Sequence, residues 1–402
     1  MEKPKNYFFK KHLSSALTQI YQAPMTVIIA PPGYGKEVAV SYYTMSTNAL
    51  TLWVNVPKGA GGGYFCGALK NALSQIEGEA SVFDNALPIC HGSMDAATSF
   101  LRDMMAKSPK KIALVIDNFQ NIPEPDNAYR FLAHVASCNI PHLHIVLLST
   151  RYLPVSADDL LNGTIARIGK SLFCLDNEGI ERFFASYGIE MSKDCIKKAA
   201  TFSEGWLSAL SALANAILEK GAFDEGAIAD AKRRIGAYLR EAIWTDIPDT
   251  ARNFLTMMSI TDAFTPGQAR NVCLLTGTKT NAEAILKLLE GRHVLDICDD
   301  GSYRMHNIML SLARKEAKSL PTGLFEMAAR ALAEDDGQDL NPAASRLSAR
   351  EWEVLELLQG GKKYKEIAAA LYISQNTVKT VVSSIYRKLG IQSKKELVIN
   401  GQ

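Results

Sequence analysis

Residues 26–37 read Thr-Val-Ile-Ile-Ala-Pro-Pro-Gly-Tyr-Gly-Lys-Glu, and an apolar segment follows from Val38. The β-branched residues predict a short strand, the glycines predict a turn, and the apolar segment predicts a helix. A strand, a glycine turn ending in Gly-Lys, and a helix are the context of a phosphate-binding loop. There the N–H groups of Gly33, Tyr34 and Gly35 would surround an anion, and Lys36 would add a positive charge. The stretch therefore predicts an anion or nucleotide site.

Two further apolar segments end in polar residues that suit the same site. Residues 110–118 read Lys-Lys-Ile-Ala-Leu-Val-Ile-Asp-Asn, which predicts a buried parallel strand ending at Asp117. This is the form of a Walker-B strand, whose acid helps to hold Mg²⁺. Residues 145–151 read Ile-Val-Leu-Leu-Ser-Thr-Arg, so a third strand would bring Arg151 to the same sheet edge. Strands that alternate with helices and end in polar residues indicate an α/β fold, a doubly wound parallel sheet with its site at that edge.

Two residues depart from the pattern of a hydrolytic phosphate-binding loop. Glu37 follows Lys36, where a Ser or Thr hydroxyl usually binds Mg²⁺. A carboxylate about 4 Å from a phosphate charge costs about 4 kcal/mol per charge pair at an effective dielectric constant of about 20, unless a cation between them makes the carboxylate a ligand. Asn118 stands where hydrolytic relatives often carry a second acid, and an amide cannot act as a base. We therefore expect ATP or ADP with Mg²⁺ as the ligand, without rapid hydrolysis.

The composition is that of a globular protein with more than one domain. The chain has 402 residues, of which 47% are hydrophobic and 21% charged, and single cores rarely grow beyond about 250–300 residues. No apolar run approaches the roughly 20 residues that span a bilayer, and residues 1–5 lack the apolar stretch of a secretion signal. The seven cysteines are scattered, which favours reduced thiols over a disulfide framework or a zinc site. These features predict a cytoplasmic protein without a membrane partner.

Positive charge is concentrated near the C-terminal end. Residues 345–402 contain ten Lys or Arg and five Asp or Glu, whereas the rest of the chain contains 34 and 37. The segment from 347 to 358 begins with Ser348 and Glu351 in a capping-box spacing and predicts a first helix, which Gly360 and Gly361 end. A second helix is expected at about 364–372 and a third at about 375–389, with Ser374 as its N-cap. The basic segment is thus predicted to be a small helical domain.

The third predicted helix has an apolar face and a polar face. Val378, Val381, Val382, Ile385 and Leu389 recur at helical spacing and would hold it against its neighbours. The other faces carry polar residues, none of them acidic: Asn376, Thr377, Lys379, Thr380, Ser383, Arg387 and Lys388. A helix with donors and positive charge, exposed by a short turn, suits the major groove of double-stranded DNA. Basic side chains neutralise phosphates, and short hydroxyl and amide side chains allow close approach to base edges.

The segment from 347 to 390 resembles the LuxR-type helix-turn-helix domain. The match includes Leu-Ser-x-Arg-Glu at 347–351, Lys-Glu-Ile-Ala at 365–368, and the residues from 374 through 390. The resemblance implies that Lys379, Thr380 and Ser383 face the bases or the groove, and that Arg387 and Lys388 take phosphates. It also implies a fourth, dimerising helix at about 393–399, binding to DNA as a homodimer or higher homo-oligomer, and RNA polymerase as a partner.

The preceding three quarters of the chain resemble the nucleotide-binding part of large ATP-dependent LuxR-type regulators, the maltose-regulator-like signal-transduction ATPases. Besides the loop and the two strands, Ser-Glu-Gly-Trp-Leu at 203–207 resembles their helical subdomain, and residues 238–264 resemble the start of their winged helix. Tyr-Arg-Met-His-Asn at 303–307 resembles their closing motif, whose histidine, here His306, contacts the β-phosphate of ADP. Asn307 departs from the Asp of that motif, and His306 as a satisfied core histidine remains an alternative.

These pieces predict five parts and leave three functional hypotheses. The parts are a P-loop sheet domain at 1–160, a helical subdomain at 161–225, a winged helix at 226–320, a linker at 321–345, and the helix-turn-helix domain at 346–402. The linker leaves no room for the helical-repeat sensor of the larger regulators. The first hypothesis is a DNA-binding transcription regulator switched by nucleotide. The alternatives are a regulator whose N-terminal body is a scaffold without nucleotide, and a true signal-transduction NTPase with an accessory tail.

Overall fold

The computed structural model describes most of the chain in two compact units. The described residues are 11–77, 94–106, 110–276, 278, 280–320, 322–333, 354, 357–358, 362–371 and 374–389. One unit comprises residues up to Ile243 together with Gly291–Val294 and His306–Ile308. The other comprises Trp244–Glu290, Leu295–Met305 and the residues from Met309 onward.

The first unit is built on a five-stranded parallel sheet in the order β2-β3-β4-β1-β5. Its strands are β1 (Met25–Ile29), β2 (Leu50–Asn55), β3 (Ile112–Asp117), β4 (Leu143–Ser149) and β5 (Ile165–Gly169). All residues of β1 and β3 are buried, as expected for parallel strands covered on both faces. This five-stranded parallel sheet confirms the predicted doubly wound α/β fold.

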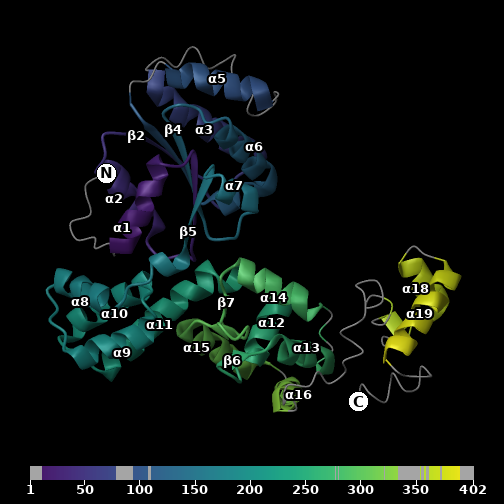
Figure 1. The fold of residues 1–402 in the computed structure, drawn as a ribbon. Coiled ribbons are helices and arrows are strands. Elements are labelled where there is room, and N and C mark those ends of the chain that lie inside the picture. The colour runs from purple at the N-terminus through teal and green to yellow at the C-terminus, as the bar shows by residue number, and fades with distance from the viewer. Residues whose placement is uncertain are drawn as a thin grey trace. The chain divides into compact units, whose positions relative to one another are not determined.

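Helices cover both faces of this sheet (Figure 1). On one face, apolar side chains of α3, α5 and α6 pack in one core with alternate strand residues such as Val27 and Leu114. Figure 1 shows α1 and α2 on the opposite side of the sheet. The helices of this part are α1 (Lys11–Leu17), α2 (Lys36–Met45), α3 (Gly62–Glu77), α5 (Met94–Ala106), α6 (Pro125–Ser137) and α7 (Ala157–Leu161).

Strand β5 extends the sheet beyond residue 160, where the sequence analysis ended it. Residues 165–169 pair in parallel with β1, on the side of β1 opposite to β4. In this register Val27 is paired with Arg167. The segment was missed because Arg167 and the flanking glycines interrupt its apolar pattern. The sheet domain therefore includes residues through at least 169.

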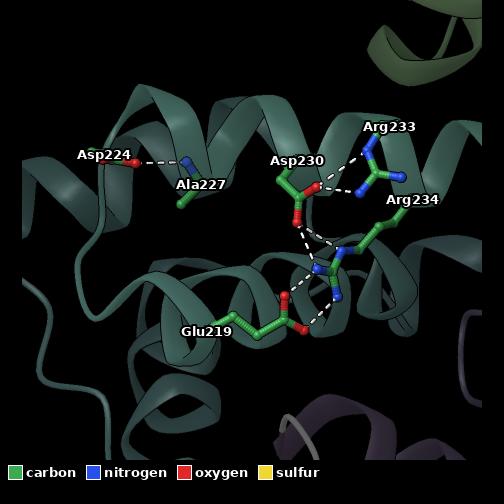
Figure 2. Close-up of polar contacts among 6 residues, drawn as sticks. All are labelled: Glu219, Asp224, Ala227, Asp230, Arg233 and Arg234. Carbon is green, nitrogen blue, oxygen red and sulfur yellow. Dashed lines mark hydrogen bonds and ion pairs between the residues drawn. The ribbon is translucent and has the colours of Figure 1, made fainter.

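Four helices follow the sheet in the first unit: α8 (Asn177–Ser186), α9 (Lys193–Ser203), α10 (Leu207–Lys220) and α11 (Glu225–Ala242). Helix α11 packs against α10, so this subdomain continues past the predicted boundary at 225. Asp224 caps α11, because its Oδ1 accepts a hydrogen bond of 2.6 Å from the N–H of Ala227. Figure 2 shows Arg234 of α11 paired with both Glu219 of α10 and Asp230. These contacts join the two helices along their exposed side.

The second unit begins with helices arranged around a small antiparallel sheet. The order is α12 (Asp249–Met258), β6 (Ala263–Phe264), α13 (Pro266–Leu275), α14 (Ala282–Gly291), β7 (Leu295–Ile297) and β8 (Tyr303–Met305), then α15 (Asn307–Glu316). The strands pair in the order β6-β8-β7. The assignment of this part as a winged helix stays a prediction. Helix α16 (Thr322–Ala333) packs against α12 and α13, so the first half of the predicted linker is a folded helix.

Two further helices are described near the C-terminal end, α18 (Tyr364–Ala370) and α19 (Gln375–Leu389). They agree closely with the second and third helices predicted there. Seven buried apolar residues form their common core: Val354, Leu358, Ile367, Ala368, Val378, Val382 and Ile385. Most of the first predicted helix, and the whole of the fourth, lie outside the described residues.

Two findings concern membrane-spanning helices and cysteines. Within the described ranges, no helix has the length and apolar character needed to cross a bilayer. The expectation of reduced thiols is wrong at Cys66 of α3, which is disulfide-bonded. Five other cysteines carry free thiols: Cys138, Cys174, Cys195, Cys273 and Cys298.

Candidate functional site

The glycine loop lies between the buried strand β1 and the first turn of α2. Gly33 and Gly35 have φ angles of 79° and 78°, a left-handed conformation that glycine adopts without steric cost. Gly35 is the N-cap residue of α2, and Lys36 is its first helical residue. Such a turn directs successive N–H groups, and the positive end of the helix dipole, toward one place. The loop therefore has the backbone of a phosphate-binding site, as the sequence predicts.

Lys36 is buried within this loop. Its Nζ donates hydrogen bonds to the carbonyl oxygens of Ala30, at 2.6 Å, and Pro31, at 3.1 Å. Burial lowers the pKa of Lys36 to about 8, although the negative charges of Asp117 and Glu37 oppose this shift. The ammonium is therefore still mostly protonated at pH 7, and its charge lies inside the loop.

A second charged group, Asp117, lies at the end of β3 and is 5% exposed. Burial, and next the negative charge of Glu37, raise the pKa of Asp117 to about 7. The N–H of Asn118 donates to Oδ1 of Asp117 at 2.7 Å and favours the ionised form. Glu37 itself is exposed on the first turn of α2. Three of the predicted site residues, Lys36, Glu37 and Asp117, are thus brought into electrostatic contact.

The chemistry of these donors fits a nucleotide with a divalent cation. Mg²⁺ in phosphate sites usually takes one or two protein carboxylates and completes its shell with water and phosphate oxygens. Asp117 and Glu37 are such a pair, and a cation between them would relieve the repulsion that raises the pKa of Asp117. Within the described residues no cluster of three or more His, Cys, Asp or Glu side chains suits a metal. A cation held by Asp117 and Glu37 would take its remaining ligands from water and phosphate oxygens.

The outer side of the loop is held by the segment that begins α10. Nε1 of Trp206 donates to the carbonyl of Pro32 at 3.1 Å. The N–H and the hydroxyl of Ser208 both donate to the carbonyl of Gly33, at 3.1 and 3.0 Å. The ring of Trp206 stacks against that of Tyr34 with 6.0 Å between centroids. The carbonyls of Pro32 and Gly33 are thus both bound by the segment that begins α10.

His306 packs on the same tryptophan. Its ring meets that of Trp206 edge to face, with 5.6 Å between centroids. Nε2 lies 3.0 Å from the carbonyl of Ser203, and Nδ1 accepts the N–H of Ile308 at 3.2 Å. Both ring nitrogens therefore contact backbone, as in the core-histidine alternative. Its predicted contact with a nucleotide phosphate stays a prediction.

Arg151 has an exposed side chain just beyond β4. The hydroxyl of Ser149 donates to the carbonyl of Arg151 at 2.8 Å and accepts its N–H at 3.0 Å. Ser149 thus fixes the turn that carries Arg151. The predicted contact between the Arg151 guanidinium and a bound nucleotide stays a prediction.

Several residues near this edge were not singled out from the sequence as site residues. Ser208 and the indole N–H of Trp206 bind the loop, and an amide chain of Asn55, Asn118 and Gln120 spans the ends of β2 and β3. Trp206 was part of the segment at 203–207 that resembles the helical subdomain, but that resemblance gave it no role at the loop. No pattern in the sequence joins Asn55 to Asn118.

The second candidate site is the exposed face of α19. Ser374 caps this helix as predicted, because its Oγ accepts the N–H of Thr377 at 3.0 Å. The side chains at five predicted DNA-binding positions are exposed: Asn376, Thr377, Lys379, Thr380 and Ser383. The backbone of α19 continues through positions 387 and 388, whose side chains lie outside the described residues. The helix thus has a buried apolar face and an exposed face with donors and a positive charge.

Comparisons with known proteins define the class of the C-terminal segment. Residues 345–400 match the family model described as bacterial regulatory proteins, luxR family. A probable transcriptional regulatory protein NarL of Mycobacterium tuberculosis is 44% identical over 63 residues, which are 16% of this chain and 29% of that protein. The HTH-type transcriptional regulator MalT of Vibrio parahaemolyticus is 36% identical over 58 residues, 14% of this chain and 6% of that protein. The chain thus matches less than a third of the length of either relative.

The remainder is similar in fold to a solved Walker-type ATPase of Pyrococcus abyssi. That similarity has a TM-score of 0.57 at 14% sequence identity and covers 78% of this chain and 97% of that one. At this sequence identity the similarity concerns the fold alone. The chain therefore combines a P-loop ATPase-like module with a LuxR-type helix-turn-helix domain, which confirms the resemblance inferred from its sequence.

Proposed function

We propose that the chain is a sequence-specific DNA-binding transcription regulator that inserts α19 into the major groove. The observation that carries this proposal is the capped helix itself. It has a buried stripe of Val378, Val382 and Ile385, and exposed donors on the opposite face. The match of residues 345–400 to a family of regulatory proteins supports the same function. Lys379 would contact base edges or phosphates, and Ser383 allows the helix to come close to the groove.

Two copies of the chain would bind paired half-sites. One recognition helix makes few base contacts, so a second copy on a two-fold site raises both affinity and discrimination. The basic segment from 345 to 402, with ten Lys or Arg against five Asp or Glu, would supply the attraction to phosphates. RNA polymerase would be the protein partner of the DNA-bound dimer.

The P-loop module would act as the switch by binding ATP or ADP. Lys36 and the loop N–H groups would hold the phosphates, and Asp117 with Glu37 would hold Mg²⁺, whose charge would offset repulsion between the carboxylates and the phosphates. His306 packs on Trp206, whose indole binds the loop at Pro32, so a change in the loop would be transmitted to His306 through this tryptophan.

Selection of duplexes from a random pool by the full-length chain tests DNA recognition. We expect a preferred duplex that binds more weakly as salt rises, because phosphate contacts release counterions. Lys379→Ala should weaken binding to that duplex by about 5- to 100-fold. Lys362→Ala, which removes an exposed lysine before α18, is the matched control and should retain most of the affinity. Binding of all duplexes alike, or an unchanged affinity in Lys379→Ala, would contradict the proposal.

Nucleotide binding is tested separately by thermal unfolding of the full-length chain with Mg²⁺ and ATP or ADP. At a ligand concentration 100 times the Kd, binding should stabilise the folded chain by about 2.7 kcal/mol. Lys36→Ala should abolish this shift, because it removes the positive charge inside the loop. The absence of any shift in the parent chain would leave the scaffold hypothesis in place of the nucleotide switch.

A further inference from the structure

An amide chain crosses the edge of the sheet beside Asp117. Nδ2 of Asn118 donates to Oδ1 of Asn55 at 3.0 Å, and Nε2 of Gln120 donates to Oδ1 of Asn118 at 3.2 Å. Oε1 of Gln120 in turn accepts the backbone N–H of Thr150 at 3.0 Å. These residues, which we call the amide relay, connect the ends of β2, β3 and β4.

The direction of every bond in the relay follows from its last member. A backbone N–H can only donate, so the carbonyl oxygen of Gln120 must face Thr150. The amino group of Gln120 then faces Asn118, which must present its oxygen. The amino group of Asn118 therefore faces the oxygen of Asn55. The orientation of three side-chain amides is thus fixed by one backbone donor.

Asn118, the central member of the relay, stands at the sequence position where hydrolytic relatives often carry a second acid. Asn118 follows Asp117 directly, and its own N–H binds the Asp117 carboxylate at 2.7 Å. Its side-chain oxygen is already an acceptor for Gln120, and its amino group is already a donor to Asn55. An amide has no basic lone pair at neutral pH and cannot take a proton from water.

We propose that the site, in which the relay holds an amide where a base would act, preserves a bound nucleoside triphosphate, so that it reports which nucleotide it has taken up instead of timing a hydrolysis. This inference rests on the proposed nucleotide binding. Asn118 acts here as a positioning residue, held by Asn55 and Gln120. The state of the chain would then change by exchange between triphosphate and diphosphate in solution.

The relay can hold a carboxylate at position 118 with one local change. In Asn118→Asp, Gln120 would still donate to the new side chain. Asn55 is exposed, so its amide can rotate to present Nδ2 as the second donor. The new carboxylate could then accept a proton from water while the water oxygen forms a bond to the γ-phosphorus. The bond from that phosphorus to the bridging oxygen would break, and the products would be the diphosphate and inorganic phosphate.

The experiment identifies the nucleotide retained by the full-length chain. Parent chain and variants are incubated with Mg²⁺ and ATP, freed of excess nucleotide and denatured, and the released nucleotide is separated by chromatography. We expect intact ATP from the parent chain and ADP from Asn118→Asp, with at least about tenfold faster phosphate release, since a positioned base contributes about 10²- to 10⁴-fold. Asn118→Ala should retain ATP.

Asn121→Asp is the control for added charge. Asn121 lies near the relay but donates instead to the carbonyl of Val56 at 2.9 Å, so this variant should retain ATP. Thermal shifts with ATP establish that each variant still binds nucleotide and is folded. ADP in the parent chain, or unchanged phosphate release from an Asn118→Asp variant that binds ATP, would overturn the relay proposal alone. No ATP-dependent shift in the parent chain would overturn the nucleotide site as well.

Discussion

The contact between the phosphate loop and α10 predicts an unusually large effect of Gly33→Ala. A Cβ atom on Gly33 would lie 2.3 Å from Oγ of Ser208, 2.9 Å from its Cβ and 2.9 Å from Nε1 of Trp206. Gly33 also has a φ angle of 79°, a conformation that alanine adopts with strain. The substitution therefore combines backbone strain with overlap on a buried, hydrogen-bonded contact.

The magnitude can be built from three parts. Left-handed backbone costs a non-glycine residue about 1–2 kcal/mol. Overpacking of a well-packed site adds about 1–3 kcal/mol. Separation of Ser208 from the Gly33 carbonyl would weaken two hydrogen bonds, each worth about 1 kcal/mol. We expect the free energy of unfolding to fall by about 3–6 kcal/mol.

Gly59→Ala is the matched control for the backbone part. Gly59 has the same φ angle of 79°, but no atom lies within 4 Å of the Cβ that it would gain. Urea denaturation should give a loss of about 1–2 kcal/mol for Gly59→Ala. In the Gly33→Ala background, Ser208→Ala should recover part of the stability because it removes the nearest atom. Equal losses for the two glycine variants would refute the contact between Gly33 and Ser208.

Two further predictions concern the ionisable pair and the tryptophan. The folded-state pKa of Asp117, about 7, exceeds its ordinary value of 3.8, so its ionisation disfavours the folded chain, and this contribution to stability should be lost as pH rises from about 4 to about 7. Glu37→Gln should make that fall smaller in urea denaturation at pH 5, 6 and 7, and parallel curves for the two chains would contradict the coupling. Trp206→Phe leaves the carbonyl of Pro32 without its indole donor and should cost about 1–3 kcal/mol in thermal unfolding. An unchanged stability would show that ring packing alone matters at this position.

Local patterns predicted the parts of the fold that depend on neighbours in sequence. The β-branched run before the glycines became β1, and α2 begins at Lys36. The predicted third helix of the C-terminal segment has the same bounds as α19, because Ser374 is a strong cap and the valines keep a helical period. The continuation of the sheet into β5 was missed, because its alternation is broken by a charged residue.

The parts that could not be predicted depend on distant residues. Asn55 and Asn118 are 63 positions apart, and Trp206 is 174 positions from Pro32. Single asparagines and serines have no periodic signature, and tertiary structure decides which of them meet. The loop, its lysine and its acid could therefore be predicted from the sequence. The side chains that hold the back of the loop or fix Asn118 could not.

Genome-wide occupancy of the chain in its native cell tests the central claim most directly. The claim is that the exposed face of α19 recognises particular DNA sequences. We expect discrete sites that share a two-fold motif, and we expect Lys379→Ala to lose them at an unchanged level of folded chain while Lys362→Ala keeps them. Occupancy without discrete sites, or the same sites in the Lys379→Ala variant, would contradict the claim.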